Sequence, residues 1–331
     1  MPAARHRALL PVLLAGLLAT ATASISLGPV ALPGRQVLEA FSGGGDEVTR
    51  AIVLELRLPR TLVALLVGAM LGLAGGVLQG YLRNPLAEPS VLGASNSAAL
   101  GAVGAIYFGI AERHVALLPL LAILFGLLAL LLLFGLAGRS ESPLALVLAG
   151  IAVSTLAGAG ISLALNLSSN PFAAMEIMSW LLGSVENRSM EHVWIALPCV
   201  AMGLSMLLFD TRALDALSLG EDGARSLGVN LRRTRARLLI GLAVGVGGAV
   251  AVSGSIGFIG LIVPHLIRPF TDRSPSAVLM PSMLGGAMLL ASADILVRLI
   301  PTHSELKLGV VTAFLGVPVF LVHLLRERRL W

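Results

Sequence analysis

Long stretches without a charged residue limit the folds open to this chain of 331 residues. Asp, Glu, Lys and Arg are absent from nine runs, 8–34, 61–82, 89–111, 114–138, 142–175, 193–209, 238–267, 274–293 and 308–325. A helix needs about 20 apolar residues to cross the hydrocarbon core of a membrane. The runs therefore predict an all-α integral membrane protein. They leave too little chain for a second domain, so we expect a single transmembrane domain over residues 1–331.

The first run follows Arg5 and Arg7 and contains the small-residue segment "ATATAS". This arrangement is open to two interpretations, a cleaved signal peptide or a retained first helix. Signal peptides have an apolar core of about 7 to 15 residues, and residues 8–34 exceed that length. We expect a retained helix.

Basic residues near both ends of the chain predict the topology, because positive charge on short loops marks the cytoplasmic side. Two cytoplasmic termini need an even number of crossings. The run 238–267 contains "SGSIG" and is divided there into two crossings of about 16 residues each, or roughly 24 Å of helix. The second, "GFIGLIVPHLIRPF", should be a short segment surrounded by protein. Ten crossings keep most of the 23 basic residues in the cytoplasm. Nine crossings would instead place the basic residues near the C-terminus outside.

Two glycine-rich segments resemble each other, "LLVGAMLGLAGGVLQG" from Leu65 and "LLIGLAVGVGGAVAVSG" from Leu238. Three of their glycines recur at one constant spacing, and five crossings separate the two copies. This pattern predicts a five-plus-five inverted repeat, with chance similarity of glycine-rich helices as the alternative. Glycines at 68, 72, 76 and 80 predict a helix face for close packing.

The most polar long stretch is "SLGEDGARSLGVNLRRTRAR", residues 218–237. It lies between the sixth and seventh predicted crossings, on the cytoplasmic side. Its glycines predict two short helices, around 212–219 and 221–227. The alternative is a solvated basic loop that contacts anionic lipid. Nucleic acid is not an expected partner, because the arginines lie between apolar runs and not on a soluble module.

Few residues could perform chemistry. Cys199 is the single cysteine, and Lys307, the single lysine, follows no Gly-rich phosphate loop. We expect no catalytic residue, no metal site and no cofactor bound by this chain. His265 is either a pathway residue or an interfacial histidine. Asp294 and Arg298 are spaced for an i, i+4 ion pair, and a binding role for Arg298 is the alternative.

The fifth predicted crossing carries a line of small and weakly polar side chains, suited to a close helix contact or to a wetted pathway. These are Ser154, Thr155, Gly158, Gly160, Ser162 and Asn166. The segment that follows, "NPFAAMEIMSWLLGS", predicts a short amphipathic helix at the outer surface, with Trp180 as its interfacial anchor.

Six blocks together resemble the membrane subunits of ABC importers for iron chelates, haem and cobalamin. They are "LRLPRTLVALLVGA" from Leu56, "QGYLRNPLAEPSVLGASNSAALGA" from Gln79, "LGVNLRRTR" from Leu227, "GSIGFIGLIVPHLIR" from Gly254, "ADILVR" from Ala293 and "LGVVTAFLGVPVF" from Leu308. The blocks cover nearly the whole chain in order. Lys307 departs from the proline found in many members of this family, and its role is left open.

The resemblance implies a permease subunit of ten spans that forms a homodimer around a pathway. Two separate ATPase subunits, which use ATP and Mg, would dock on a coupling segment at residues 212–229. The coupling contacts would be Leu217, Leu219, Gly220, Ala224, Leu227 and Gly228. A soluble substrate-binding protein would dock on Arg57, Arg60 and Arg298, for which lipid-headgroup contact is the alternative. The cytoplasmic gate would lie near Ser140 and Ser142, and the pathway along Ser154, Thr155, Gly158, Ser162 and Asn166.

The function expected from the resemblance is uptake of a ferric siderophore into the cytoplasm from a periplasmic or extracellular binding protein. The chain would lie in the bacterial inner membrane with both termini in the cytoplasm, and it would not be an enzyme. Haem or cobalamin uptake is the alternative within the family. An ion-driven secondary transporter and a non-transporting membrane scaffold are the alternatives outside it.

Overall fold

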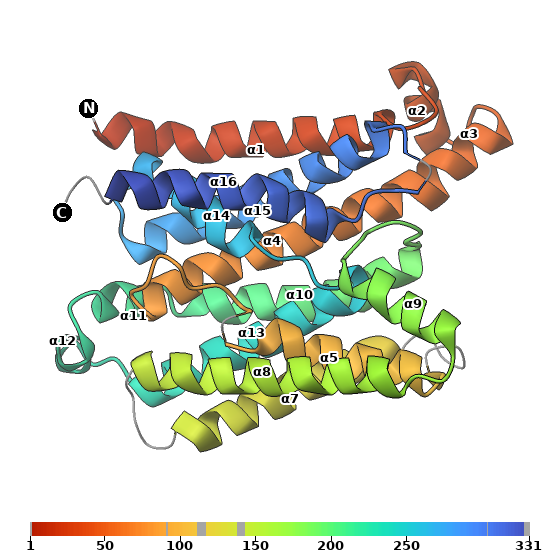
Figure 1. Ribbon diagram of the computed structural model, residues 1–331. Helices are drawn as coiled ribbons and strands as arrows, with labels where there is room; N and C mark the ends of the chain where they lie inside the picture. The colour runs from red at the N-terminus through yellow and green to blue at the C-terminus, as the bar shows by residue number, and fades with distance from the viewer. Residues whose placement is uncertain (1, 91, 111–116, 138–142, 303, 328–331) are drawn as a thin grey trace.

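The computed structural model describes residues 2–90, 92–110, 117–137, 143–302 and 304–327 (Figure 1). These residues form helices joined by short connections, with no strand among them. The elements are α1 (Pro2–Ser26), α2 (Gly34–Phe41), α3 (Glu47–Ala51), the π-helical turn η1 (Ile52–Arg57), α4 (Leu58–Tyr81), α5 (Ala94–Tyr107), α7 (Leu117–Ala137), α8 (Pro143–Leu167), α9 (Pro171–Leu181), α10 (Met190–Phe209), α11 (Thr211–Leu217), α12 (Glu221–Ser226), α13 (Leu231–Ser253), α14 (Ile259–Ile267), the 3₁₀ turn η2 (Arg268–Phe270), α15 (Pro275–Leu299) and α16 (Leu308–Glu327).

Within the described ranges, six helices are long and apolar enough to cross a membrane. They are α1, the continuous helix from α3 to α4, α8, α10, α13 and α15. Shorter apolar helices lie within α7, α14 and α16. The all-helical membrane class is therefore confirmed, while the count of ten crossings and the inverted repeat stay predictions.

The helices divide into a buried centre and an apolar exterior. The apolar window of α13 is 83% buried and that of α3–α4 is 78% buried, whereas only 6% of the α1 window is buried. Central helices must fit closely on several sides, because protein interiors are packed as densely as crystals. The exposed apolar side chains of α1 are those expected at a lipid-facing surface.

The glycine periodicity of α4 proves to be a packing feature, as predicted. A Cβ added at Gly68 would collide with the carbonyl of Gly286 on α15, and one at Gly80 would lie 3.1 Å from the Cβ of Pro275. Four glycines one helical turn apart face α15 in this way, namely Gly68, Gly72, Gly76 and Gly80. Bare glycine faces allow two backbones to approach closely inside a membrane.

The run 238–267 is broken where predicted, but its halves are unequal. The break spans Gly254–Phe258, between α13 of 23 residues and α14 of only nine. The prediction of two 16-residue halves was wrong, because α13 begins at Leu231 within the basic stretch, where Asn230 accepts a hydrogen bond from the Arg233 amide. The capping asparagine starts the helix before the apolar run begins.

The short helix α14 is surrounded by protein, as expected. Pro264 has no N–H, so the carbonyl of Gly260 lacks its partner within the helix. Gln79 of α4 supplies the missing donor, because its Nε2 lies 3.2 Å from the Gly260 oxygen. Arg268 in turn donates to Gln79 Oε1 at 2.9 Å. An interrupted helix at membrane depth requires such internal partners.

The two ends of the bundle differ in what they carry. The start of α1, the end of α16 and the pair α11–α12 lie at one end, called here the basic end (Figure 1). The helices α2, α3 and α9 lie at the opposite end (Figure 1). The helix α15 runs between the two ends and packs against α1, α4 and α11.

Candidate functional site

The connector at the basic end contains the two short helices that its glycines predicted. Gly220, between α11 and α12, has φ +94°, a conformation that side chains with a Cβ rarely adopt. Leu217 and Ala224 are buried against the bundle. Leu219 and Leu227 are 70% and 65% exposed. Of the predicted coupling residues, the buried pair fixes the connector in place, and the exposed pair is available to a partner.

Two hydrogen-bonded carboxylates attach this connector to the long helices. Asp215 Oδ1 of α11 accepts from the backbone N–H of Ser276 at 2.9 Å, in the first turn of α15. Asp210 pairs with Arg237 at 3.2 Å, and the Arg237 guanidinium lies 4.3 Å from the ring centre of Phe209. Burial raises the pKa of Asp210, and Arg237 opposes that shift. A force applied to α11 therefore reaches α15 through a direct contact.

The exposed part of the connector combines leucines with arginines. Gly228, another predicted coupling residue, is exposed beside Leu227. Four arginines on or next to the connector are exposed, Arg212, Arg225, Arg232 and Arg233. Arginine is enriched at protein interfaces, and the exposed leucines supply apolar surface that a partner could bury. The connector has the composition of a protein-docking surface.

At the opposite end, two of the three predicted docking arginines, Arg60 and Arg298, meet at Asp294, and Arg57 binds the end of α1. Arg60 Nη2 lies 2.7 Å from Asp294 Oδ1, and Arg60 Nη1 donates to Glu305 Oε2 at 3.0 Å. Arg298 Nη2 pairs with Asp294 Oδ2 at 3.0 Å, which confirms the i, i+4 ion pair. The Asp294 side chain is fully buried, and its two oxygens are both bonded by these arginines.

The same cluster holds the end of α1. Arg298 donates to the Ser24 carbonyl at 2.9 Å and to Ser24 Oγ at 2.7 Å. Arg57 donates to the carbonyls of Ile25 at 3.0 Å, Ser26 at 2.6 Å and Val30. The carbonyls of Ser24, Ile25 and Ser26 belong to the last turn of α1, where backbone acceptors lack helical partners, and Val30 follows that turn. We call Arg57, Arg60, Asp294, Arg298 and Glu305 the arginine clasp.

The burial of the clasp limits which of the three predicted docking arginines a partner protein could contact. Arg57 and Arg298 are only 5% and 9% exposed, and their guanidinium groups already have acceptors inside the chain. The sequence indicated the i, i+4 pair, but no signal identified Ser24 or Glu305 as partners. These contacts join segments far apart in the sequence.

The predicted pathway residues lie on α8, most of whose length is exposed in the single chain. Thr155, Ser162 and Asn166 are exposed, and Gly158 is half-buried. Ser154 faces α5, where its Oγ lies 2.6 Å from Asn96 Nδ2. The predicted gate residues at 140 and 142 lie outside the described residues.

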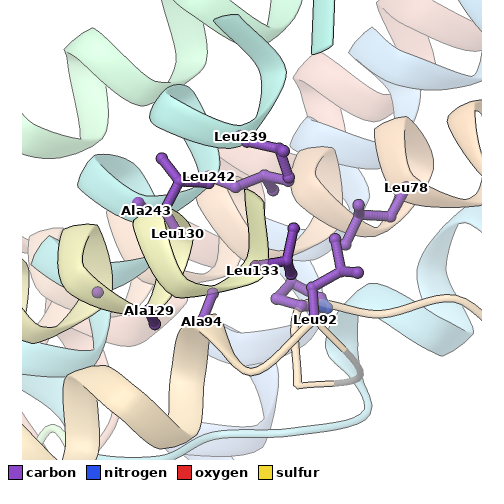
Figure 2. A pocket seen from close by; sticks show the side chains of 11 residues that line it. Leu78, Leu92, Ala94, Ala129, Leu130, Leu133, Leu239, Leu242 and Ala243 are labelled. Carbon is purple, nitrogen blue, oxygen red and sulfur yellow. The ribbon is translucent and has the colours of Figure 1, made fainter. Parts of the chain in front are cut away.

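A small pocket between α4, α5, α7 and α13 is lined by apolar side chains. Figure 2 shows Leu78, Leu92, Leu133, Leu239 and Leu242 gathered around it. Its volume is about 20 Å³, close to the space needed by one water molecule. In the described part of the chain, no group of three or more His, Cys, Asp or Glu could hold a metal ion. The pocket is a packing void and offers no cage for a ligand.

A helical membrane bundle with a small-residue face on α8 and a two-helix connector has the features of a transport subunit. Residues 16–326 match the FecCD transport family. The chain belongs to this family, and it is an ABC transporter permease.

Relatives of known name share most of their length with this chain. It is 39% identical to the Fe(3+) dicitrate transport system permease protein FecD of Escherichia coli, over 92% of this chain and 94% of that protein. It is 38% identical to the vitamin B12 import system permease protein BtuC of Citrobacter koseri, over 87% and 86% of the two chains. A solved metal-chelate type ABC transporter in an inward-facing conformation superimposes with a TM-score of 0.83 and 33% identity, covering 96% of this chain and 99% of that one.

Proposed function

We propose that this chain is the permease subunit of an ATP-driven importer that moves a ferric siderophore from a soluble binding protein into the bacterial cytoplasm. The observation that carries the proposal is the full-length relationship to FecD, whose name assigns it to ferric dicitrate transport. Cobalamin is the second candidate substrate, because BtuC is related over a similar length. Haem is the third, by the family resemblance alone.

The proposed assembly is a homodimer of this chain with two ATPase subunits, in the inner membrane and with both termini cytoplasmic. Each chain would cross the membrane ten times as two inverted halves. The exposed small-residue face of α8 supports a pathway between two copies, because weakly polar side chains can be wetted without binding a chelate tightly. The ATPases would use ATP and Mg, and this chain would contribute no catalytic residue and bind no cofactor.

The ATPase contact is proposed at the coupling segment, residues 212–229, and its test uses the exposed leucines. The double variant Leu219→Ser and Leu227→Ser should fold normally, because exposed substitutions usually change stability by less than about 0.5 kcal/mol. It should no longer retain the ATPase during affinity purification. Leu56→Ser, an equally exposed leucine at the opposite end, is the matched control. Full ATPase retention by the double variant would exclude this surface.

Docking of the binding protein is proposed at the opposite end, with Arg60 as its contact. Arg57 and Arg298 would position α1 and α15 there, since their donors are occupied inside the chain. Glu305, whose side chain is 20% exposed, is the partner of Arg60 that an incoming carboxylate could replace. Charge-assisted pairing of arginine with carboxylate suits such a dock.

The substrate is tested by uptake in liposomes that contain the permease, its ATPase and its binding protein. ATP-dependent accumulation of a ferric siderophore is the expected result. Accumulation of cobalamin or haem in its place would overturn the substrate while leaving the importer mechanism intact. Uptake that continues without ATP would overturn the mechanism itself.

A further inference from the structure

Two ion pairs start from the connection between α15 and α16, only two residues apart. Glu305 binds the arginine clasp, where Arg60 Nη1 donates to its Oε2 at 3.0 Å. Lys307, the only lysine of the chain, donates to Glu186 Oε2 at 3.0 Å, in the connection between α9 and α10. The blue connection from α15 to α16 lies at the end of the bundle that also carries α9 (Figure 1). We call residues 304–307 the strap, because their contacts join the clasp to the region of α9.

The Lys307 end of the strap is fixed to both α16 and α9. The Lys307 carbonyl accepts from the amides of Val310 and Val311 at 3.1 and 3.2 Å, in the first turn of α16. In the same turn, the Gly309 amide donates at 3.1 Å to the carbonyl of Leu182, the residue that caps α9. A Cβ at Gly309 would collide with that carbonyl, so glycine is needed for this close approach. A displacement of the strap at this end is therefore passed to the end of α9.

The Glu305 end of the strap can be exchanged. Arg60 has a second carboxylate partner, Asp294, whose side chain is fully buried, whereas the Glu305 side chain is 20% exposed. Because Asp294 stays bound, Arg60 can exchange Glu305 for another carboxylate without leaving a buried charge unpaired. Glu305 is therefore the residue with which an incoming carboxylate competes for Arg60.

We propose that the strap couples docking of the binding protein to the position of α9, an inference that rests on the proposed docking contact at Arg60. In the undocked chain, the pair of Lys307 and Glu186 holds Glu305 against Arg60. A carboxylate of the binding protein displaces Glu305, and the strap passes its displacement through Lys307 and Glu186 to α9. Residues 168–170 alone separate α9 from α8, which carries the proposed pathway face. Docking at the clasp is thereby communicated to the pathway.

Coupling between two sites is reciprocal, so the anchor of the strap must also affect the affinity for the binding protein. Without Glu186, the strap holds Glu305 less firmly against Arg60, and the binding protein meets a weaker competitor. The same change disconnects α9 from the docking contact. Loss of the anchor should therefore raise the affinity and at the same time weaken the response of α9 to docking. An ion pair with only a structural role would not produce this combination.

The test uses Glu186→Gln in the assembled complex of permease and ATPase, with the substrate-free binding protein as the probe. The dissociation constant of the binding protein should fall about twofold to fivefold, the range that corresponds to one partly exposed ion pair. In the unaltered complex, added binding protein should change hydrogen exchange at residues 171–181 of α9. In Glu186→Gln this response should be reduced by about half or more at saturating binding protein, because the link through Lys307 is lost.

Further variants separate the strap from long-range charge effects. Glu305→Gln should tighten docking by removing the competitor, and Glu186→Gln added to it should have no further effect on the affinity. A gain in affinity that persists in this double variant would come from the lost negative charge alone and would overturn the proposal. Glu39→Gln, an acid-to-amide change in an ion pair on α2 at the same end, is the matched control and should leave the affinity unchanged.

The outcomes also distinguish the strap from the docking contact itself. Unchanged affinity in Glu305→Gln would mean that the binding protein does not exchange with Glu305 at Arg60, and the docking contact and the strap would fail together. Tighter docking in Glu305→Gln, combined with unaltered affinity and an unaltered α9 response in Glu186→Gln, would support the docking contact and overturn the strap alone.

Discussion

Two pairs of arginines, one at each end of this permease, have opposite environments. At the basic end, Arg232 and Arg233 are exposed on the first turns of α13. At the opposite end, Arg57 and Arg298 are buried and bonded to backbone carbonyls and Asp294. A guanidinium can be buried only where acceptors satisfy its donors. The number of arginines at an end therefore does not show whether a partner can contact them. Their accessibility depends on whether acceptors from distant segments of the chain bind them.

The largest expected effect is at the centre of the clasp. Asp294→Ala leaves Arg60 and Arg298 buried beside each other without their shared carboxylate. Removing one partner of a buried ion pair costs about 3–5 kcal/mol. We expect a loss of that order in the free energy of unfolding, measured by denaturation of the purified chain in mild detergent.

A surface ion pair at the same end is the control for this variant. Glu39→Gln breaks the pair of Arg35 and Glu39, which are 2.8 Å apart on α2 and whose side chains are 88% and 39% exposed. Exposed pairs contribute about 0–1 kcal/mol. Equal stability losses for the two variants would contradict the contrast between buried and exposed arginines.

An intermediate effect is expected where the clasp holds α1. Arg57→Lys keeps the positive charge but replaces a planar group that reaches three carbonyls with a single ammonium. We expect a loss of about 1.5–3 kcal/mol, the range for hydrogen bonds to charged groups. Hydrogen exchange at residues 24–30 should accelerate at the same time. Unchanged exchange there would mean that Arg57 does not fix the end of α1.

The smallest effect is expected at the basic end. Asp215→Ala removes the acceptor for the Ser276 amide in the first turn of α15, a loss of about 1 kcal/mol by analogy with helix capping. Asp222→Ala on α12, whose side chain is exposed, is the matched control. In the assembled importer, Asp215→Ala should also reduce uptake per ATP hydrolysed. Unaltered uptake with reduced stability would limit Asp215 to a structural role.

Periodic and local features of the structure could be predicted from the sequence. The glycine face of α4, the pair of short connector helices and the Asp294–Arg298 pair each depend on spacings of a few residues. The break between α13 and α14 was also placed correctly, because "SGSIG" interrupts an apolar run. The sequence did not reveal the start of α13, since its basic stretch predicts a loop, whereas Asn230 caps a helix that begins at Leu231.

The candidate sites could be predicted only in part. Leu217 and Leu219 are two residues apart, yet one is buried and the other exposed, and this depends on where α11 meets the bundle. Arg60 lies at the end opposite the connector, and its partners Asp294 and Glu305 are 234 and 245 residues away along the chain.

The sequence by itself determined that this protein is a helical membrane protein, because hydropathy and short-range spacing act within single helices, and its similarity to the FecCD family identified it as a permease. Tertiary structure alone decided which charged groups are paired within the chain and which are exposed to a partner protein. That outcome depends on how close the ends of distant helices come, and on whether each buried donor finds an acceptor there.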